Sequence, residues 1–226
     1  MDIKIEKIIR TQRKTIALEV TDNATLIVRA PYRVSESTIF AVIRKHYDWI
    51  IKKKKEVEAR DPKVKAKEFV NGEGFLYLGK YYKLQIVEGQ DKPLKFANAF
   101  YLAKKALPQA EKAFTEWYKK EALIKITERV QFYAKMGGYK YSRINITNAR
   151  KRWGSCSSKG NLNFSWRLIM APLPVIDYVV VHELVHLEEK NHGKAFWTKV
   201  KILMPDYKKH EKWLKENGYV LKTGMF

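Results

Sequence analysis

Residues 181–193 read VHELVHLEEKNHG, with the pattern H-E-x-x-H directly after an apolar run. Successive residues of a helix turn by about 100°, so residues four apart lie on one face. His182 and His186 are therefore expected side by side, where their imidazole nitrogens can bind one metal ion. Glu183 is expected at the rim of that metal, in the position of a general base that takes a proton from a metal-bound water.

A catalytic zinc needs a third protein ligand, and His192 is the candidate. On a continuous helix His192 would point away from His186, so the helix must end before it. Asn191 and Gly193 flank His192, and both residue types tolerate the left-handed conformation that ends helices. We expect the helix to stop near Lys190 and the chain to turn back. A metzincin peptidase has glycine at the position of Glu189, so the pattern is not that of a standard metzincin.

The alternative interpretation of H-E-x-x-H is an amphipathic helix with two surface histidines. The other positions of this segment are apolar, which indicates a core helix, and a histidine on such a helix needs a polar partner. Three of the five histidines in the chain also fall within the eleven residues from His182 to His192. Both observations favour the metal site.

Further motifs surround this one in order: RWGSCSS at 152–158, NLNFSWRL at 161–168, FW at 196–197 and PDY at 205–207. The whole set closely resembles the YgjP-like metal-dependent hydrolases, which are related to the SprT-like and other zincin metallopeptidases. The resemblance is strongest from about Arg150 to Trp213. It implies one zinc ion per chain, bound by His182, His186 and His192, with Glu183 as the catalytic residue.

The composition is that of a folded, basic chain. The 226 residues are 46% hydrophobic and carry a net charge of +21. Nucleic acid is a candidate partner for such a chain. The charge is spread over both halves of the sequence, however, and a lysine-rich solvated surface is the alternative. One cysteine excludes an internal disulfide framework. There is no signal-peptide pattern and no apolar run of membrane-spanning length, so we expect a cytoplasmic protein without membrane contact.

The order of elements predicts an α+β fold with two regions. Residues 1–105 are expected to form an N-terminal β-rich region with one long helix from about Glu36 to Arg60, capped by Ser35. Residues 106–226 are expected to form a zincin-like catalytic domain. In it, a helix over 109–136 ends at Gly137-Gly138, and the metal-binding helix begins near Val175.

The loop from Ala149 to Gly160 is basic and rich in glycine and serine. Backbone N–H groups, hydroxyls and cations in one loop suit an anion site, and the alternative is a solvated connection. Because arginine binds phosphate or carboxylate in a bidentate manner, Arg152 and Arg167 are the candidate substrate contacts. Either arginine could instead brace the fold through a buried carboxylate.

Cys156 is expected to be a small buried residue rather than a fourth ligand. The strand Asn161–Leu168 is expected beside the metal, where it could pair with an extended substrate.

Three functions fit these observations. The first is a zinc-dependent hydrolase, with a peptide bond as the target that the zincin resemblance favours. The second keeps the metal site and changes the substrate to a nucleoside triphosphate, since some YgjP-like proteins are described as UTP pyrophosphatases. The third is a nucleic-acid-binding module with a structural metal. The three histidines and Glu183 argue against the third function, because a structural zinc site normally has four ligands.

Overall fold

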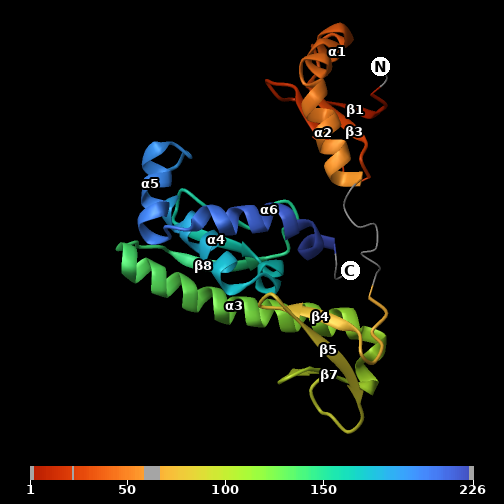
Figure 1. The fold of residues 1–226 in the computed structure, drawn as a ribbon, viewed down its shortest axis with the longest axis vertical. Coiled ribbons are helices and arrows are strands. Elements are labelled where there is room, and N and C mark those ends of the chain that lie inside the picture. Colours follow the sequence, from red (N-terminus) through yellow and green to blue (C-terminus); the bar gives the residue numbers. More distant parts are fainter. Residues whose placement is uncertain (1–2, 22, 59–66, 224–226) are drawn as a thin grey trace. The chain divides into compact units, whose positions relative to one another are not determined.

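The computed structural model describes residues 3–21, 23–58 and 67–223. The chain divides into two compact units, Met1–Val64 and Lys65–Phe226 (Figure 1). Each unit has its own hydrophobic core. The α+β prediction is confirmed by helices and mixed sheets in both units. No helix among the described residues is long and apolar enough to cross a membrane.

The smaller unit is a three-stranded sheet with two helices. In the order β1-β3-β2, the strands are β1 (Ile5–Thr11), β3 (Leu26–Pro31) and β2 (Ala17–Val20). Alternate residues of β3 are buried, and they pack with Ile39, Ile43 and Ile50 of the helices. Ser35 caps the first helix as predicted, because its hydroxyl accepts the N–H of Thr38 at 3.2 Å.

The long helix predicted from Glu36 to Arg60 is instead two helices, α1 (Glu36–Lys45) and α2 (Tyr47–Glu58). His46 separates them, with φ −107° and ψ 19°, outside the helical region. Its backbone N–H still bonds to the carbonyls of Val42 and Ile43, so the chain bends without leaving the helical path entirely. Arg60 lies outside the described residues.

The larger unit begins with a four-stranded sheet of order β4-β5-β7-β6. Its strands are β4 (Gly74–Tyr77), β5 (Lys80–Val87), β6 (Leu94–Phe96) and β7 (Phe100–Ala103). A 3₁₀ helix, η1 (Lys104–Gln109), leads into the long helix α3 (Ala110–Gly137). Phe114 of α3 stacks on Phe75 of β4 with ring centres 4.1 Å apart. Aromatic packing therefore fixes this sheet to the first half of α3 (Figure 1).

This packing changes the predicted division of the chain. The expected boundary lay between residues 105 and 106, but the sheet over residues 74–103 belongs to the same unit as the metal-binding helix. The β4–β5 turn confirms the connection, since the N–H groups of Leu78 and Gly79 donate to the carbonyls of Ile169 and Met170 at 3.0 Å. The separate N-terminal unit ends near Val64. The strands before residue 64 pack on α1 and α2, whereas the strands over 74–103 pack on α3, and composition alone does not distinguish the two segments.

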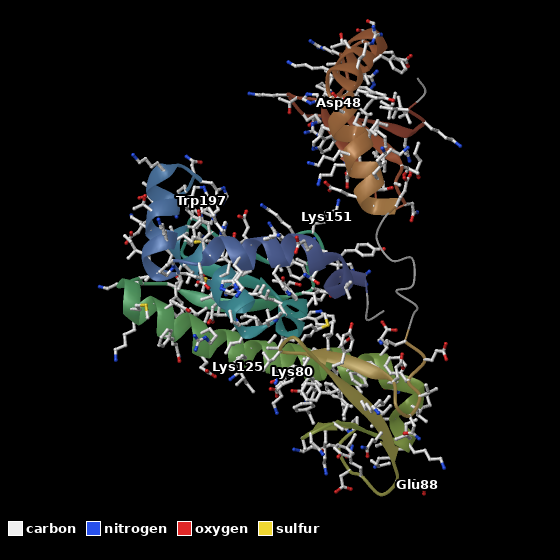
Figure 2. The ribbon with its side chains drawn as sticks, viewed as in Figure 1. Asp48, Lys80, Glu88, Lys125, Lys151 and Trp197 are labelled. Atoms are coloured by element: carbon white, nitrogen blue, oxygen red, sulfur yellow. The ribbon has the colours of Figure 1, made fainter. Side chains whose placement is uncertain are left out.

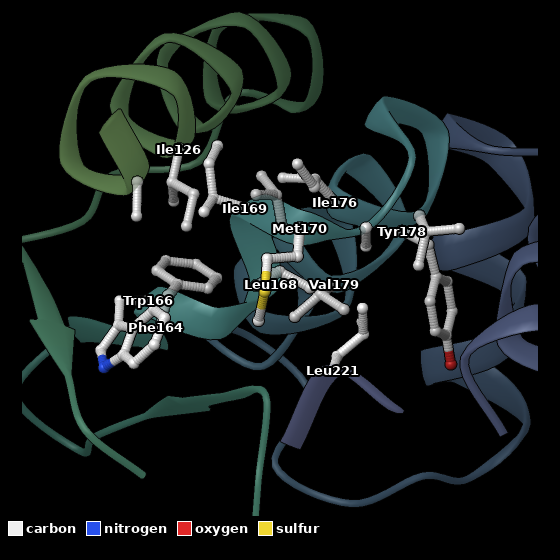
Figure 3. Close-up of a cluster of buried hydrophobic side chains, with 14 of the residues drawn as sticks. Ile126, Phe164, Trp166, Leu168, Ile169, Met170, Ile176, Tyr178, Val179 and Leu221 are labelled. Carbon is white, nitrogen blue, oxygen red and sulfur yellow. The ribbon is translucent and has the colours of Figure 1, made fainter. Parts of the chain in front are cut away.

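The second half of α3 packs on the remaining elements, and Gly138 ends it in the left-handed conformation as predicted. The second sheet has the order β8-β10-β9, from β8 (Arg143–Thr147), β10 (Asn161–Ser165) and β9 (Gly154–Cys156). After it come η2 (Trp166–Met170), α4 (Leu173–Val185), α5 (Lys194–Leu203) and α6 (Tyr207–Thr223). Figure 3 shows apolar side chains of α3, η2, α4 and α6 meeting around Leu168 and Met170.

The strand expected over Asn161–Leu168 differs from the structure in two ways. It ends at Ser165, because residues 166–170 form a 3₁₀ helix. It is also the central strand of its sheet, so its backbone already pairs on both sides. An added peptide strand needs an exposed edge. Of the described strands in this sheet, β8 and β9 lie at the edges.

Candidate metal centre

Helix α4 presents the H-E-x-x-H residues in its last turn. Pro174 lies in the first turn of α4, where the missing proline N–H costs no helical hydrogen bond. Most side chains of α4 are buried. The helix ends at Val185, with His186 as C-cap, earlier than the predicted end near Lys190. The left-handed turn expected at Asn191 or Gly193 is not formed, because no described residue from 186 to 193 has a positive φ. The chain turns back through ordinary turn conformations instead.

The turn brings the three histidines together. The Nε2 atoms of His182 and His186 are 3.2 Å apart, those of His186 and His192 are 3.1 Å apart, and those of His192 and His182 are 3.0 Å apart. Ligands at 2.0–2.1 Å in tetrahedral geometry would be separated by about 3.3 Å. Among the described residues, these three form the group of histidine, cysteine and acidic side chains that could hold a metal ion. The nitrogen triangle therefore fits a zinc ion.

The hydrogen bonds and burial of the rings suit the neutral form that metal binding requires. His186 Nδ1 lies 2.9 Å from the carbonyl oxygen of Glu189. A carbonyl can only accept, so Nδ1 carries the proton and Nε2 keeps its lone pair. Burial, together with the neighbouring His186 and His192, lowers the pKa of His182 to about 3. Burial also lowers the pKa of His186. Neutral imidazole is the metal-binding form.

Aromatic side chains of α5 and α6 surround the ligands. The Phe196 ring lies 4.6–4.9 Å from all three imidazoles. Trp197 stacks on His192 at 5.8 Å, and Tyr207 stacks on Trp197 at 5.3 Å. Figure 2 shows Trp197 on α5. His192 is exposed and lies outside any helix or strand, so these ring contacts determine where its imidazole points.

Replacing Trp197 with alanine is expected to weaken zinc binding by about tenfold, because side chains that orient a ligand contribute roughly 10–100-fold to metal affinity. Zinc titration against a chromophoric chelator measures the change. Phe132→Ala is the matched control, since Phe132 is an exposed ring on α3. Equal zinc affinity in Trp197→Ala and wild type would show that the turn positions His192 without Trp197.

Glu183 is buried under the edge strand β9, with 6% of its surface exposed. Burial raises the pKa of its carboxyl to about 8, and the positive charge of Arg152 opposes the rise. Gly154 allows the strand to approach this closely. A Cβ atom at Gly154 would lie 2.6 Å from both Cγ and Oε1 of Glu183. Sequence reasoning found RWGSCSS as a motif but did not find this contact, which joins segments 29 residues apart.

Gly154→Ala is expected to lower kcat by about tenfold or more, because the new methyl group must displace the Glu183 carboxylate, and a shift of about 1 Å in an active site can cost 10²-fold. Zinc content should stay at the wild-type level. Gly74→Ala is the control, since its Cβ would meet only the exposed Tyr81 ring, at 3.3 Å. An unchanged kcat in Gly154→Ala would show that the position of Glu183 does not depend on β9.

The remaining candidates lie in two places. Arg152 is exposed, and its charge reaches Glu183. Arg167 is buried in η2 and hydrogen-bonds to Asn148. It does not brace the fold through a carboxylate, since no ion pair joins it to a described acidic residue. Cys156 is half-buried and free, and burial raises the pKa of its thiol. Among the described residues, the group that could hold a metal ion consists of the three histidines and does not include Cys156.

Comparison with known proteins places the chain in a family. The sequence model described as "YgjP-like, metallopeptidase domain" matches residues 14–217. The chain belongs to the YgjP-like family. Membership in this family makes the protein a metal-dependent hydrolase. The predicted resemblance is therefore confirmed.

Two individual proteins are similar to this YgjP-like chain over part of its length. The UTP pyrophosphatase of Escherichia coli (strain K12) is 35% identical over 64 residues, which is 28% of this chain and 38% of that relative. The crystal structure of the metallopeptidase zymogen of Pyrococcus abyssi abylysin covers 45% of this chain and 99% of its own, with 19% identity and a TM-score of 0.38. The chain thus matches well under two thirds of the E. coli protein.

Proposed function

We propose that this YgjP-like hydrolase is a zinc-dependent metallopeptidase, with His182, His186 and His192 as zinc ligands and Glu183 as general base. The observation that carries the proposal is the convergence of three Nε2 atoms to within 3.0–3.2 Å of one another. Three protein ligands and one open position are typical of a catalytic zinc site. When bound, zinc would supply Lewis-acid chemistry, which polarises a substrate oxygen and lowers the pKa of water.

Glu183 performs the proton transfers in this proposal. Its buried carboxylate has an increased affinity for a proton, because burial disfavours the charged form. It takes a proton from the attacking water and later donates it to the leaving group. Gly154 and the strand β9 hold the carboxylate in place and exclude water from one side of it.

Arg152 is the proposed substrate contact at the centre. Its side chain is exposed, and its positive charge acts to lower the pKa of Glu183. A guanidinium in this position can bind an anionic oxygen of the substrate. It would also stabilise negative charge that develops during the reaction.

The second candidate function is a nucleoside-triphosphate pyrophosphatase with the same zinc site. Two observations favour it: the similarity to the E. coli protein named UTP pyrophosphatase, and the cation at Arg152. Nucleic acid binding with a structural metal is the least supported, since a structural zinc normally has four protein ligands and the described residues offer three. Zinc is proposed over other divalent metals because it binds imidazole nitrogens well and because the three nitrogens are spaced as in a tetrahedral site.

Hydrolysis assays on zinc-loaded protein separate the two enzyme functions. One arm follows cleavage of unstructured peptides by mass spectrometry, and the other follows pyrophosphate release from a panel of nucleoside triphosphates. Peptide cleavage that is lost in His192→Ala, together with its zinc, supports the metallopeptidase. Pyrophosphate release with the same dependence supports the second function. Activity that survives the loss of zinc contradicts both.

A further inference from the structure

Arg167 is a buried charge without a counter-charge among the described residues. It lies in η2 with 3% of its surface exposed, and its guanidinium carbon sits 4.3 Å from the centre of the Trp166 ring. No ion pair links it to an acidic residue in the described part of the chain. A buried charged group is normally paired, because removal from water is costly. This position therefore differs from Arg129, the other well-packed arginine of the larger unit, which pairs with Asp177.

One nitrogen of the Arg167 guanidinium, Nη1, has hydrogen-bond partners among the described residues. Nη1 donates to Oδ1 of Asn148 at 2.8 Å and to its backbone oxygen at 3.4 Å. Asn148 Oδ1 also accepts the indole N–H of Trp166 at 2.9 Å, so the asparagine is held in one orientation. Nε and Nη2 have no hydrogen-bond partner within residues 3–21, 23–58 and 67–223. Asn148 thus fixes the guanidinium and leaves its other N–H groups available.

The available edge of the guanidinium is not completely enclosed. Among the described residues, the fully buried side-chain nitrogens and oxygens without a hydrogen-bond partner are Arg13 Nε and His182 Nδ1. Nε and Nη2 of Arg167 are not in that set, so both keep some contact with solvent. The side chain of Asn148, which lies against the guanidinium, is exposed. The guanidinium therefore lies next to a surface residue.

The charge of a second cation, Arg150, acts on Arg167. Burial and the neighbouring Arg150 lower the pKa of Arg167 to about 10. The group remains charged at neutral pH. Arg150 is exposed and belongs to the loop between β8 and β9, in which Figure 2 labels Lys151. The charge of Arg150 therefore acts on the Arg167 guanidinium, and no ion pair joins either arginine to a described acidic residue. A bound anion would stabilise this arrangement.

We propose that Arg167 and Arg150 form a binding site for a phosphate-type dianion. The planar edge formed by Nε and Nη2 of an arginine matches two oxygens of such a group. Two positive charges favour a dianion over a singly charged carboxylate. Binding here does not require hydrolysis, so the site goes beyond the proposed reaction. Arg152 lies two residues after Arg150, and its charge acts on Glu183. The same loop therefore connects the proposed anion site with the candidate metal centre.

Calorimetric titration of the 226-residue chain with inorganic phosphate tests the site, at constant ionic strength and with zinc-loaded and zinc-free samples. Saturable binding is expected in both. Arg167→Met should raise the Kd by about tenfold or more, as expected for the loss of hydrogen bonds to a charged group. Arg150→Gln should raise it less. Arg143→Gln removes an exposed charge from the edge strand β8 and should leave the Kd unchanged.

Three results would overturn the proposal. The first is no saturable phosphate binding to folded wild-type protein. The second is binding that disappears with zinc and is unchanged in Arg167→Met, because the phosphate would then lie on the metal. The third is equal affinity for acetate, which would rule out a site built for a dianion. If Arg167→Met does not fold, Arg167→Lys keeps the charge and loses the planar fork, and it should bind phosphate more weakly than wild type.

Discussion

Glu183→Gln is expected to lower kcat/KM by about 10²–10⁴-fold, the usual contribution of a general base. The amide has nearly the same shape as the carboxylate but cannot accept the proton of the attacking water. Zinc content should remain at the wild-type level, because the three proposed ligands are untouched. Steady-state kinetics and metal analysis of the same samples measure both quantities.

Glu188→Gln provides the control for this prediction. Glu188 lies five residues further on, is exposed, and pairs with Lys199 at 2.9 Å. It should retain wild-type kinetics. Retention of near-wild-type activity in Glu183→Gln would remove Glu183 from the proposed chemistry. Loss of zinc together with activity would give Glu183 a role in metal binding instead.

The second large effect is expected at the ion pair that joins α3 to α4. Arg129 Nε donates to Oδ1 of Asp177 at 2.6 Å, Nη2 donates to Oδ2 at 3.0 Å, and the Tyr133 hydroxyl donates to Oδ2 at 3.3 Å. The Asp177 side chain is 9% exposed and that of Arg129 is 17% exposed. Asp177→Asn leaves the arginine without its counter-charge. We expect a loss of about 3 kcal/mol in the free energy of unfolding, the lower end for a buried pair, because Arg129 retains some solvent.

Urea unfolding followed by circular dichroism measures this loss. Glu128→Gln is the matched control, since it breaks the exposed pair with Lys125 on the same helix and should cost under about 1 kcal/mol. The double variant Arg129→Met/Asp177→Leu should recover much of the stability, because it removes both charges. A cost in Asp177→Asn no larger than in Glu128→Gln would show that the pair contributes little.

Several local features followed from the sequence alone. Ser35 and Gly138 mark a helix start and a helix end because capping depends on one or two residues and their nearest backbone groups. His182 and His186 share a face because that depends only on helix geometry. The sequence also placed His192 near them, but predicted the wrong turn, since the helix ends at Val185 and none of the described residues 186–193 is left-handed. Several turn conformations can connect the same two points.

The environment of each site depended on packing between segments far apart in the chain. Glu183 is buried because Gly154 of β9 lies on it, and His192 is oriented by Trp197 and in turn by Tyr207. Arg167 looked like a companion of Arg152, but η2 buries it beside Asn148, where the charge of Arg150 also acts on it. No periodicity or spacing records such contacts, because they arise only when separate elements meet.

The sequence by itself determined that this protein has an α+β fold, a histidine set at metal-binding spacing and the motifs of the YgjP-like family. These properties reside in residue types and short-range geometry, which the chain carries before it folds. Only the tertiary structure decided that the unit boundary lies near Val64, that β10 is a central strand, and that the buried Arg167 has no carboxylate partner within the described part of the chain. These properties depend on which surfaces exclude water together, and that is settled by the packing of the whole unit.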